Sequence, residues 1–189
     1  MFISYQEFED NLRRVQASIL SAEAKSGRPV GSVTLLPVTK NHPVDAALYA
    51  FRSGLRSVGE NRVQEALSKM DDADSALSWE LIGPLQSNKA KKVAERFDRV
   101  QSVDRPKVAK ALQRYASEAG RNLRVLLQIN AGADPNKSGA SLEEASALLE
   151  CALEQSNLKV DGLMTIAPWD DDPTAVSYTH LTLPTNREV

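Results

Sequence analysis

The feature that most constrains the fold of this chain is a repeated alternation of short apolar runs with amphipathic helical segments. Six mostly apolar runs, typical of buried strands, lie at residues 33–38, 55–59, 79–83, 99–103, 123–130 and 160–166. After each of the first five, apolar residues recur at helical spacing, as at Val44, Ala47, Leu48 and Phe51. Strands that alternate with single helices predict right-handed βαβ units and a parallel sheet.

Two closures of such a sheet compete, an open doubly wound sheet and a barrel. No Gly-x-Gly-x-x-Gly pattern follows the first strand, which disfavours a dinucleotide-binding open sheet. Each helix has one apolar stripe, and the units have the length typical of a barrel. We therefore expect a TIM-type (β/α) barrel with about six of its eight units present. A helix should precede the first strand, because Ser4 and Glu7 have the spacing of a capping box.

The last residues of the sequence do not continue this pattern. After Pro173 the helical stripe is lost, and residues 176–189 are a Thr-rich polar stretch with one proline. We expect residues 1–175 to form one incomplete barrel domain and residues 176–189 to be a non-native or disordered tail.

Composition disfavours several classes of protein. The chain has 23 basic and 25 acidic residues, so its net charge does not indicate nucleic acid or an anionic membrane as a partner. A local basic cluster is expected to be a solvated helix face; it comprises Lys89, Lys91, Lys92 and Arg96. No segment is long and apolar enough to span a bilayer, and the single cysteine is compatible with a reducing compartment, so we expect a cytoplasmic protein.

The sequence also lacks the residue clusters that metal sites and serine hydrolase sites need. The only histidines are His42 and His180, so no His/Cys cluster predicts a metal site. The sequence contains no Gly-x-Ser-x-Gly turn, which disfavours a serine hydrolase of the α/β type. No pair of carboxylates with readable acid/base spacing stands out, and we assign no catalytic residue.

Lys40 ends the first apolar run and precedes an Asn-His-Pro turn. Ligand chemistry gathers at the carboxyl ends of strands in α/β proteins, so an amine here is well placed for covalent chemistry. If its stem lies on apolar side chains, the amine loses hydration and releases its proton more easily, as imine formation with an aldehyde requires. The alternative reading is an ordinary solvated loop charge.

Several other strand ends carry neutral polar groups. Asn61 follows the second run, Gly83 ends the third and Ser87 follows it, and Met164 lies near the end of the sixth. A lone lysine among amides and hydroxyls fits an aldehyde cofactor better than it fits hydrolysis. Asn61 and Ser87 could instead be helix caps, and Met164 could be core filler.

Five short motifs resemble, in order and spacing, the pyridoxal phosphate homeostasis protein family. They are residues 36–40 (LPVTK), 59–65 (GENRVQE), 82–89 (IGPLQSNK), 128–130 (QIN) with 137–139 (KSG), and 162–164 (GLM). The resemblance covers about residues 5–167 and implies a single-domain version of the alanine racemase barrel. It also implies that pyridoxal 5′-phosphate (PLP) is held as an aldimine on Lys40, near Asn61, Gly83, Ser87 and Met164.

The sequence departs from the family pattern in two places. Glu80 follows Trp79 where family members commonly have His, and its role is open, as is that of Lys137 in the fifth loop. The resemblance also implies phosphate-binding segments in a seventh and an eighth unit, which we expect to lie beyond the last residue of this sequence.

The resemblance implies a non-catalytic PLP-binding protein that acts in intracellular PLP homeostasis. Its expected partners are PLP and, as recipients, apo PLP-dependent enzymes, and it should be a monomer or weak dimer. Two alternatives remain open, a PLP-dependent amino-acid racemase or lyase and a barrel-like binding module without a cofactor.

Overall fold

The computed structural model describes residues 3–167, which divide into two compact units. Residues 3–60 and 64–79 form the first unit, and residues 61–63 and 80–167 form the second. The boundary between the units falls inside strand β2 (Ser78–Leu81). The predicted domain end at residue 175 and the predicted tail at 176–189 lie outside the described residues.

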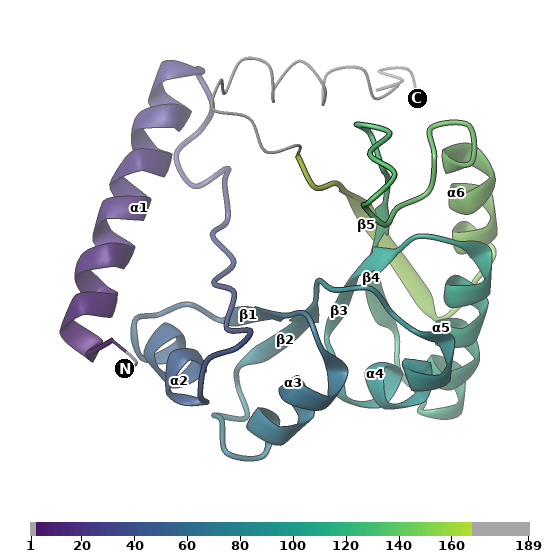
Figure 1. Ribbon diagram of the computed structural model, residues 1–189, viewed down its shortest axis with the longest axis horizontal. Coiled ribbons are helices and arrows are strands. Elements are labelled where there is room, and N and C mark those ends of the chain that lie inside the picture. Colours follow the sequence, from purple (N-terminus) through teal and green to yellow (C-terminus); the bar gives the residue numbers. More distant parts are fainter. Residues whose placement is uncertain (1–2, 168–189) are drawn as a thin grey trace. The chain divides into compact units, whose positions relative to one another are not determined.

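Helix α1 (Tyr5–Lys25) opens the first unit (Figure 1). The predicted capping box is confirmed, since the Glu7 amide donates to Ser4 Oγ and the Ser4 amide donates to the Glu7 carboxylate. The first turn of α1 packs on helix α2 (Asp45–Arg52) through an edge-to-face contact, in which the rings of Tyr5 and Tyr49 lie 5.2 Å apart. Strand β1 (Ser57–Glu60) and most of helix α3 (Val63–Met70) complete this unit.

The predicted first strand at residues 33–38 is wrong as a buried strand. Its only ladder contact in the described chain is a parallel bridge between Val38 and Gly59, and Val33 and Val38 are exposed. Two bonds hold the bridge, since the Thr39 amide donates to the Gly59 carbonyl and the Gly59 amide donates to the Pro37 carbonyl. Pro37 has no amide hydrogen to donate, which limits how far the ladder can extend.

The second unit continues the alternation of strands and helices after β2. Its elements are η1 (Ser87–Lys89), α4 (Ala90–Arg96), β3 (Arg99–Val103), α5 (Pro106–Glu118), β4 (Leu123–Gln128), α6 (Ala145–Leu153) and β5 (Leu158–Met164). The sheet order is β1-β2-β3-β4-β5, and the pairs β2-β3, β3-β4 and β4-β5 are parallel. The described residues thus contain five strands rather than the six that the sequence predicts.

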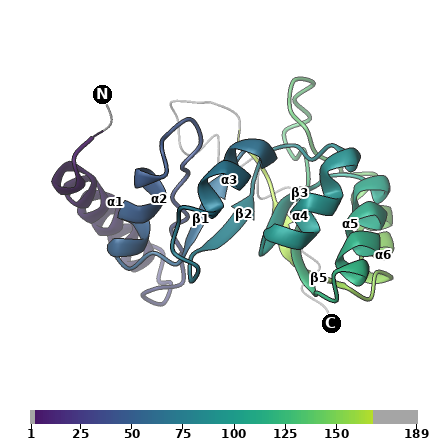
Figure 2. The same ribbon diagram turned by 90° about the horizontal axis from the view of Figure 1, so that it is seen from below.

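The core of the second unit lies between its strands and helices α4, α5 and α6, which stand side by side in Figure 2. Val100 and Val125 on the strands are fully buried, as are Val93 on α4 and Leu112 on α5. These helix residues belong to the apolar stripes predicted from the sequence, so one face of each helix covers the sheet. None of the helices in residues 3–167 combines the length and apolar character that crossing a membrane requires.

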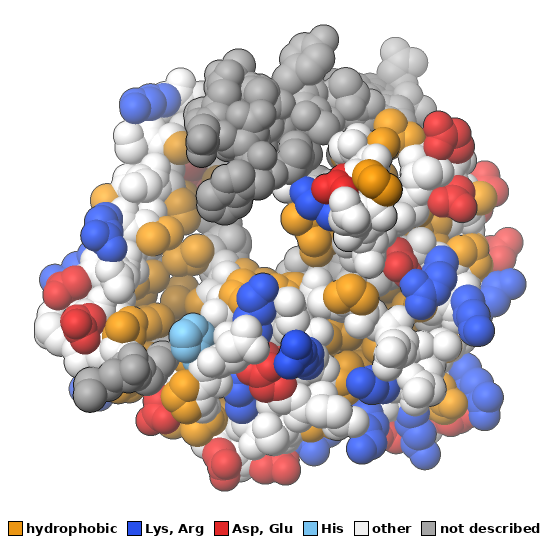
Figure 3. Space-filling model, in the orientation of Figure 1, with side chains coloured by type: hydrophobic (Ala, Val, Ile, Leu, Met, Phe, Trp, Pro, Cys, Tyr) orange, Lys and Arg blue, Asp and Glu red, His pale blue; other side chains and the backbone are white. Residues whose placement is uncertain are grey.

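The opposite faces of α4 and α5 are basic. Lys91, Lys92 and Arg96 on α4 are exposed, as are Lys107 and Lys110 on α5, and lysine and arginine side chains gather over this part of the surface (Figure 3). Of the predicted cluster, only Lys89 is half-buried, because it lies in the short helix η1.

Candidate functional site

Lys40 lies in a tight turn immediately after the bridge at Val38. The turn is closed by the His42 amide, which donates to the Thr39 carbonyl, and Asn41 adopts a left-handed backbone with φ of 61°. Lys40 is exposed, so the expected burial of its stem is not what the structure has. The segment before it bridges β1 at one residue only, which leaves the turn open to solvent. Within residues 3–167, no hydrogen bond or ion pair engages the Lys40 amine.

A buried polar cluster underlies this turn, and sequence reasoning missed it. We call Thr39, Glu60, Glu65 and Lys69 the Lys69 cluster. The Lys69 amine, on a residue that is 6% exposed, donates to Glu60 Oε1 (2.7 Å), Glu65 Oε1 (2.8 Å) and the Thr39 carbonyl (2.9 Å). The Thr39 hydroxyl also donates to Glu60 Oε1 at 2.7 Å. The available signal was the spacing of Glu65 and Lys69, four residues apart on one helix.

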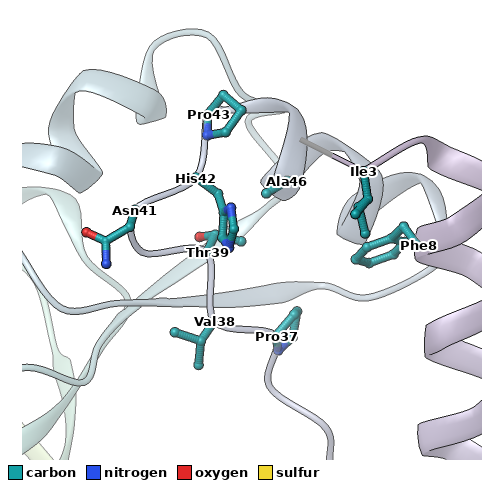
Figure 4. Close-up of a pocket in the computed structure, with 9 residues that line it drawn as sticks. All are labelled: Ile3, Phe8, Pro37, Val38, Thr39, Asn41, His42, Pro43 and Ala46. Atoms are coloured by element: carbon teal, nitrogen blue, oxygen red, sulfur yellow. The ribbon is translucent and has the colours of Figure 1, made fainter. Parts of the chain in front are cut away.

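A cavity of about 440 Å³ is lined in part by the residues on both sides of Lys40 (Figure 4). Its nine lining residues include Val38, Thr39, Asn41 and His42, with Phe8 from α1 closing one side. The Lys40 side chain is not among them. The cavity is mainly apolar. It is connected to Lys40 only through the backbone, because the neighbouring residues Thr39 and Asn41 line it.

The remaining predicted site residues lie in the second unit, and two of them are in close contact. Gly83 is buried after β2, and a Cβ atom added to it would lie 2.2 Å from the Asn61 carbonyl oxygen. The Gly83 carbonyl accepts a hydrogen bond from the Ser102 hydroxyl at 2.6 Å. Asn61 lies two residues before Val63, the first residue of α3, so Arg62 rather than Asn61 is next to the helix.

Ser87 and Met164 are both half-buried, and each lies at the end of a helix or strand. Ser87 is the first residue of η1, and its carbonyl accepts from the Ala90 amide. Met164 is the last residue of β5, where its carbonyl accepts from the Ile129 amide at 2.9 Å. The structure therefore brings Asn61 and Gly83 together and leaves Ser87 and Met164 at separate ends of elements.

The two residues whose roles were open have well-defined surroundings. Glu80 Oε2 accepts from Gln101 Nε2 at 2.7 Å and lies 3.4 Å from the Arg99 guanidinium, within the sheet of the second unit. The Lys137 amine donates to the Ala167 carbonyl at 2.8 Å and lies 3.6 Å from Asp134. Both side chains are thus engaged in the packing of their own unit.

The pKa values of two carboxyl groups of the second unit are shifted, one in the loop that holds Lys137 and one immediately after β3. Backbone donation from Asn136 is the largest cause that lowers the pKa of Asp134. Burial raises the pKa of Asp104, against the opposing charge of its neighbour Arg105. Across residues 3–167, no group of three or more His, Cys, Asp and Glu side chains could hold a metal ion.

Comparison with known proteins connects this geometry to a family. The family model described as alanine racemase, N-terminal domain, matches residues 3–187. A pyridoxal phosphate homeostasis protein of Pseudomonas aeruginosa is 41% identical over 167 residues, which cover 88% of this chain and 71% of the relative.

Solved structures give the same result. An unknown protein from Bifidobacterium adolescentis has a TM-score of 0.88 and 31% identity, over 96% of this chain and 79% of its own. PipY of Synechococcus elongatus, solved with PLP bound, has a TM-score of 0.66 and 35% identity, over 86% of this chain and 81% of its own. The predicted fold class, a TIM-type (β/α) barrel of the alanine racemase kind, is confirmed. The chain therefore belongs to the alanine racemase N-terminal domain family and, within it, to the pyridoxal phosphate homeostasis proteins.

Proposed function

We propose that this chain binds PLP reversibly through Lys40 and serves as a carrier that limits free PLP, without turnover of its own. The observation that carries this proposal is the contrast between Lys40 and two other lysines. Lys69 is buried with three partners and Lys137 donates to a carbonyl, whereas the Lys40 amine is exposed and unengaged within the described residues. An amine that must condense with an aldehyde has to be both accessible and free of competing partners.

PLP supplies an aldehyde carbon, and its condensation with a primary amine releases one water molecule whose two protons come from the amine. The part played by this chain is to present that amine and orient the ring. Lys40 presents its amine from a turn that the His42–Thr39 backbone bond closes and in which Asn41 has a left-handed backbone.

We propose Asn61, Gly83, Ser87 and Met164 as the residues that contact the cofactor. Each of them ends a strand or follows one, which is where barrels place their ligands. At Gly83 the Asn61 backbone occupies the space that a side chain would need, since an added Cβ atom would lie 2.2 Å from the Asn61 carbonyl oxygen, and this close packing fixes where Asn61 lies.

The relatives support the same reading. The Pseudomonas aeruginosa relative carries the name pyridoxal phosphate homeostasis protein, and PipY was solved with PLP bound. We propose that apo PLP-dependent enzymes receive the cofactor and that the protein acts in the cytoplasm as a monomer or weak dimer. The single cysteine, Cys151, is compatible with that reducing compartment.

The test uses the full 189-residue chain, incubated with PLP and then reduced with borohydride. We expect a visible absorption band and, after digestion, a PLP-modified peptide that contains Lys40. K40A should lose both, while K137A and K25A should keep both, since those amines are not the proposed attachment point. A wild-type chain that forms no reducible adduct would overturn the proposal. Exchange of an amino-acid α-proton by the loaded protein would favour the racemase alternative instead.

A further inference from the structure

The peptide groups on both sides of Lys40 are held by one set of buried side chains. On the amino-terminal side, the Thr39 carbonyl accepts from the Lys69 amine at 2.9 Å, and the Thr39 hydroxyl donates to Glu60 at 2.7 Å. On the carboxyl-terminal side, the Asn41 amide donates to the Glu65 carboxylate. The Lys69 cluster therefore fixes the residues before and after Lys40, while the Lys40 side chain stays unengaged within the described residues.

Lys69 is the centre of this arrangement. All three of its donor positions are used, on Glu60, Glu65 and Thr39, so one ammonium joins helix α3, strand β1 and the Lys40 turn. Its side chain is 7% exposed and that of Glu60 is fully buried, whereas that of Glu65 is 21% exposed. Bonds made in so dry a place are stronger than surface ion pairs and resist exchange with water.

The Lys69 cluster holds two carboxylates for one ammonium, which is one more than a simple ion pair would need. Two carboxylates share one ammonium, and the second oxygen of Glu60 is buried without a hydrogen-bond partner in the described structure. An unsatisfied buried carboxylate oxygen costs free energy, and a purely stabilising pair would not need it. A role in holding the Lys40 turn gives the arrangement a reason beyond stability.

We propose that Lys69 is a positioning residue for Lys40: through Glu60, Glu65 and Thr39, it fixes the turn so that the Lys40 amine points in one direction. The proposal rests on the proposed function, because the benefit of a fixed amine is faster and tighter capture of PLP. Lys69 itself touches neither the amine nor the cofactor in this scheme. Its loss leaves the Thr39 carbonyl with the His42 amide as its remaining donor and leaves two carboxylates to repel each other beneath the turn.

The first measurement does not involve PLP. Hydrogen exchange of the peptide that spans Thr39 to Asn41 should be about tenfold faster or more in K69M than in the wild type, because local opening is then less costly. K69R should restore part of the protection, since its guanidinium still donates to carboxylates. K25M, which removes an exposed lysine of α1 in the same unit, should leave exchange of this peptide unchanged.

The second measurement is the rate at which borohydride-trapped PLP appears on Lys40. In K69M we expect about a tenfold loss or more, because a displacement of about 1 Å in a reacting group can cost ~100-fold. K69M can fail to fold, since a buried ion pair is broken. The variant E65Q then replaces K69M in the test. The Glu65 side chain is partly exposed, so neutralising it disturbs folding less, and the substitution removes the negative charge that accepts from the Asn41 amide.

The outcomes separate the two proposals. Faster exchange together with slower capture supports the role of Lys69. Unchanged exchange in folded K69M or E65Q, or faster exchange with capture within about twofold of the wild type, overturns it. A wild-type chain that captures no PLP overturns the proposed function alone, and the exchange comparison still decides whether Lys69 fixes the turn.

Discussion

The backbones of Gly83 and Asn61 lie so close that a Cβ atom on Gly83 would stand 2.2 Å from the Asn61 carbonyl oxygen and 2.7 Å from its Cα. Real Cβ contacts essentially never fall below 3.0 Å. The φ angle of Gly83 is not in the left-handed region, so close approach rather than backbone conformation requires glycine here. Both residues were predicted as cofactor contacts, and their packing links the segment after β1 to the segment after β2.

The substitution G83A should therefore destabilise the chain and displace Asn61. We expect a loss of about 1–3 kcal/mol in the free energy of unfolding, as is usual when an atom is forced into a packed site. Denaturant unfolding measures this change. The affinity for PLP should fall as well, because Asn61 is one of the proposed contacts.

The matched control for G83A is G120A. Gly120 has φ of +63° and nothing within 4 Å of an added Cβ, so alanine there meets conformational strain but no collision. We expect about 1–2 kcal/mol for that strain and no effect on PLP. If G83A kept wild-type affinity for PLP, the proposed contact at Asn61 would be wrong.

Glu80 is predicted to stabilise the sheet of the second unit rather than to act on a ligand. It accepts from Gln101 and pairs with Arg99, and its residue is 6% exposed. E80A should lower the free energy of unfolding by about 1–3 kcal/mol, because two donors lose their acceptor. E80Q should lose less, since its amide oxygen still accepts from Gln101. Thermal unfolding with PLP capture as a second readout tests this, and selective loss of capture in E80Q would contradict it.

Much of the fold follows from the sequence because helix and strand periodicities are local. The apolar stripes after residues 90 and 106 became buried faces of α4 and α5, and residues 99–103 form β3 with the predicted bounds. The segment at 33–38 was misread because its branched residues favour a strand in any context. Whether they form one depends on hydrogen-bond partners for the backbone, and among the described residues the single bridge of Val38 with Gly59 is the only ladder contact of this segment.

The site was less predictable than the fold. Motif resemblance pointed to Lys40, but nothing local indicates that its amine is exposed while Lys69, in a helix 29 positions later, is buried. The contact of Lys69 with Glu60 and Thr39 joins three elements, so sequence spacing reveals only its link to Glu65. Long-range contacts of this kind arise from the tertiary fold.

The carboxylate of Glu23 is predicted to make the chain sensitive to acid. It is buried and accepts from the amides of Val33 and Gly31 and from the Ser32 hydroxyl. Donation from the Val33 amide is the largest cause that lowers the pKa of Glu23 below its ordinary value of 4.5. A lowered folded pKa means that this stabilisation is present above the unfolded pKa and is lost as pH falls through the folded one.

The measurement is thermal unfolding of E23Q and wild type across pH. At neutral pH, E23Q should unfold at a lower temperature, and the difference should shrink as the pH falls below the ordinary pKa. The control E150Q, at an exposed position on α6, should match the wild type throughout. A difference between E23Q and wild type that is the same at every pH would show that the charge of Glu23 is unimportant.

Position 41 is predicted to tolerate glycine better than alanine, because the φ of Asn41, 61°, lies in the left-handed region of backbone conformation. N41A should cost about 1–2 kcal/mol in the free energy of unfolding, whereas N41G adopts this backbone without strain. Both variants keep the amide that donates to Glu65, so the comparison isolates the backbone conformation. At Ser117, an exposed position in α5, the order should reverse, since glycine in a helix is about 1 kcal/mol worse than alanine. Denaturant unfolding of the four variants measures both orders. If N41A were as stable as N41G, the turn that presents Lys40 would not need its left-handed residue, and the conformation assigned to this turn would be wrong.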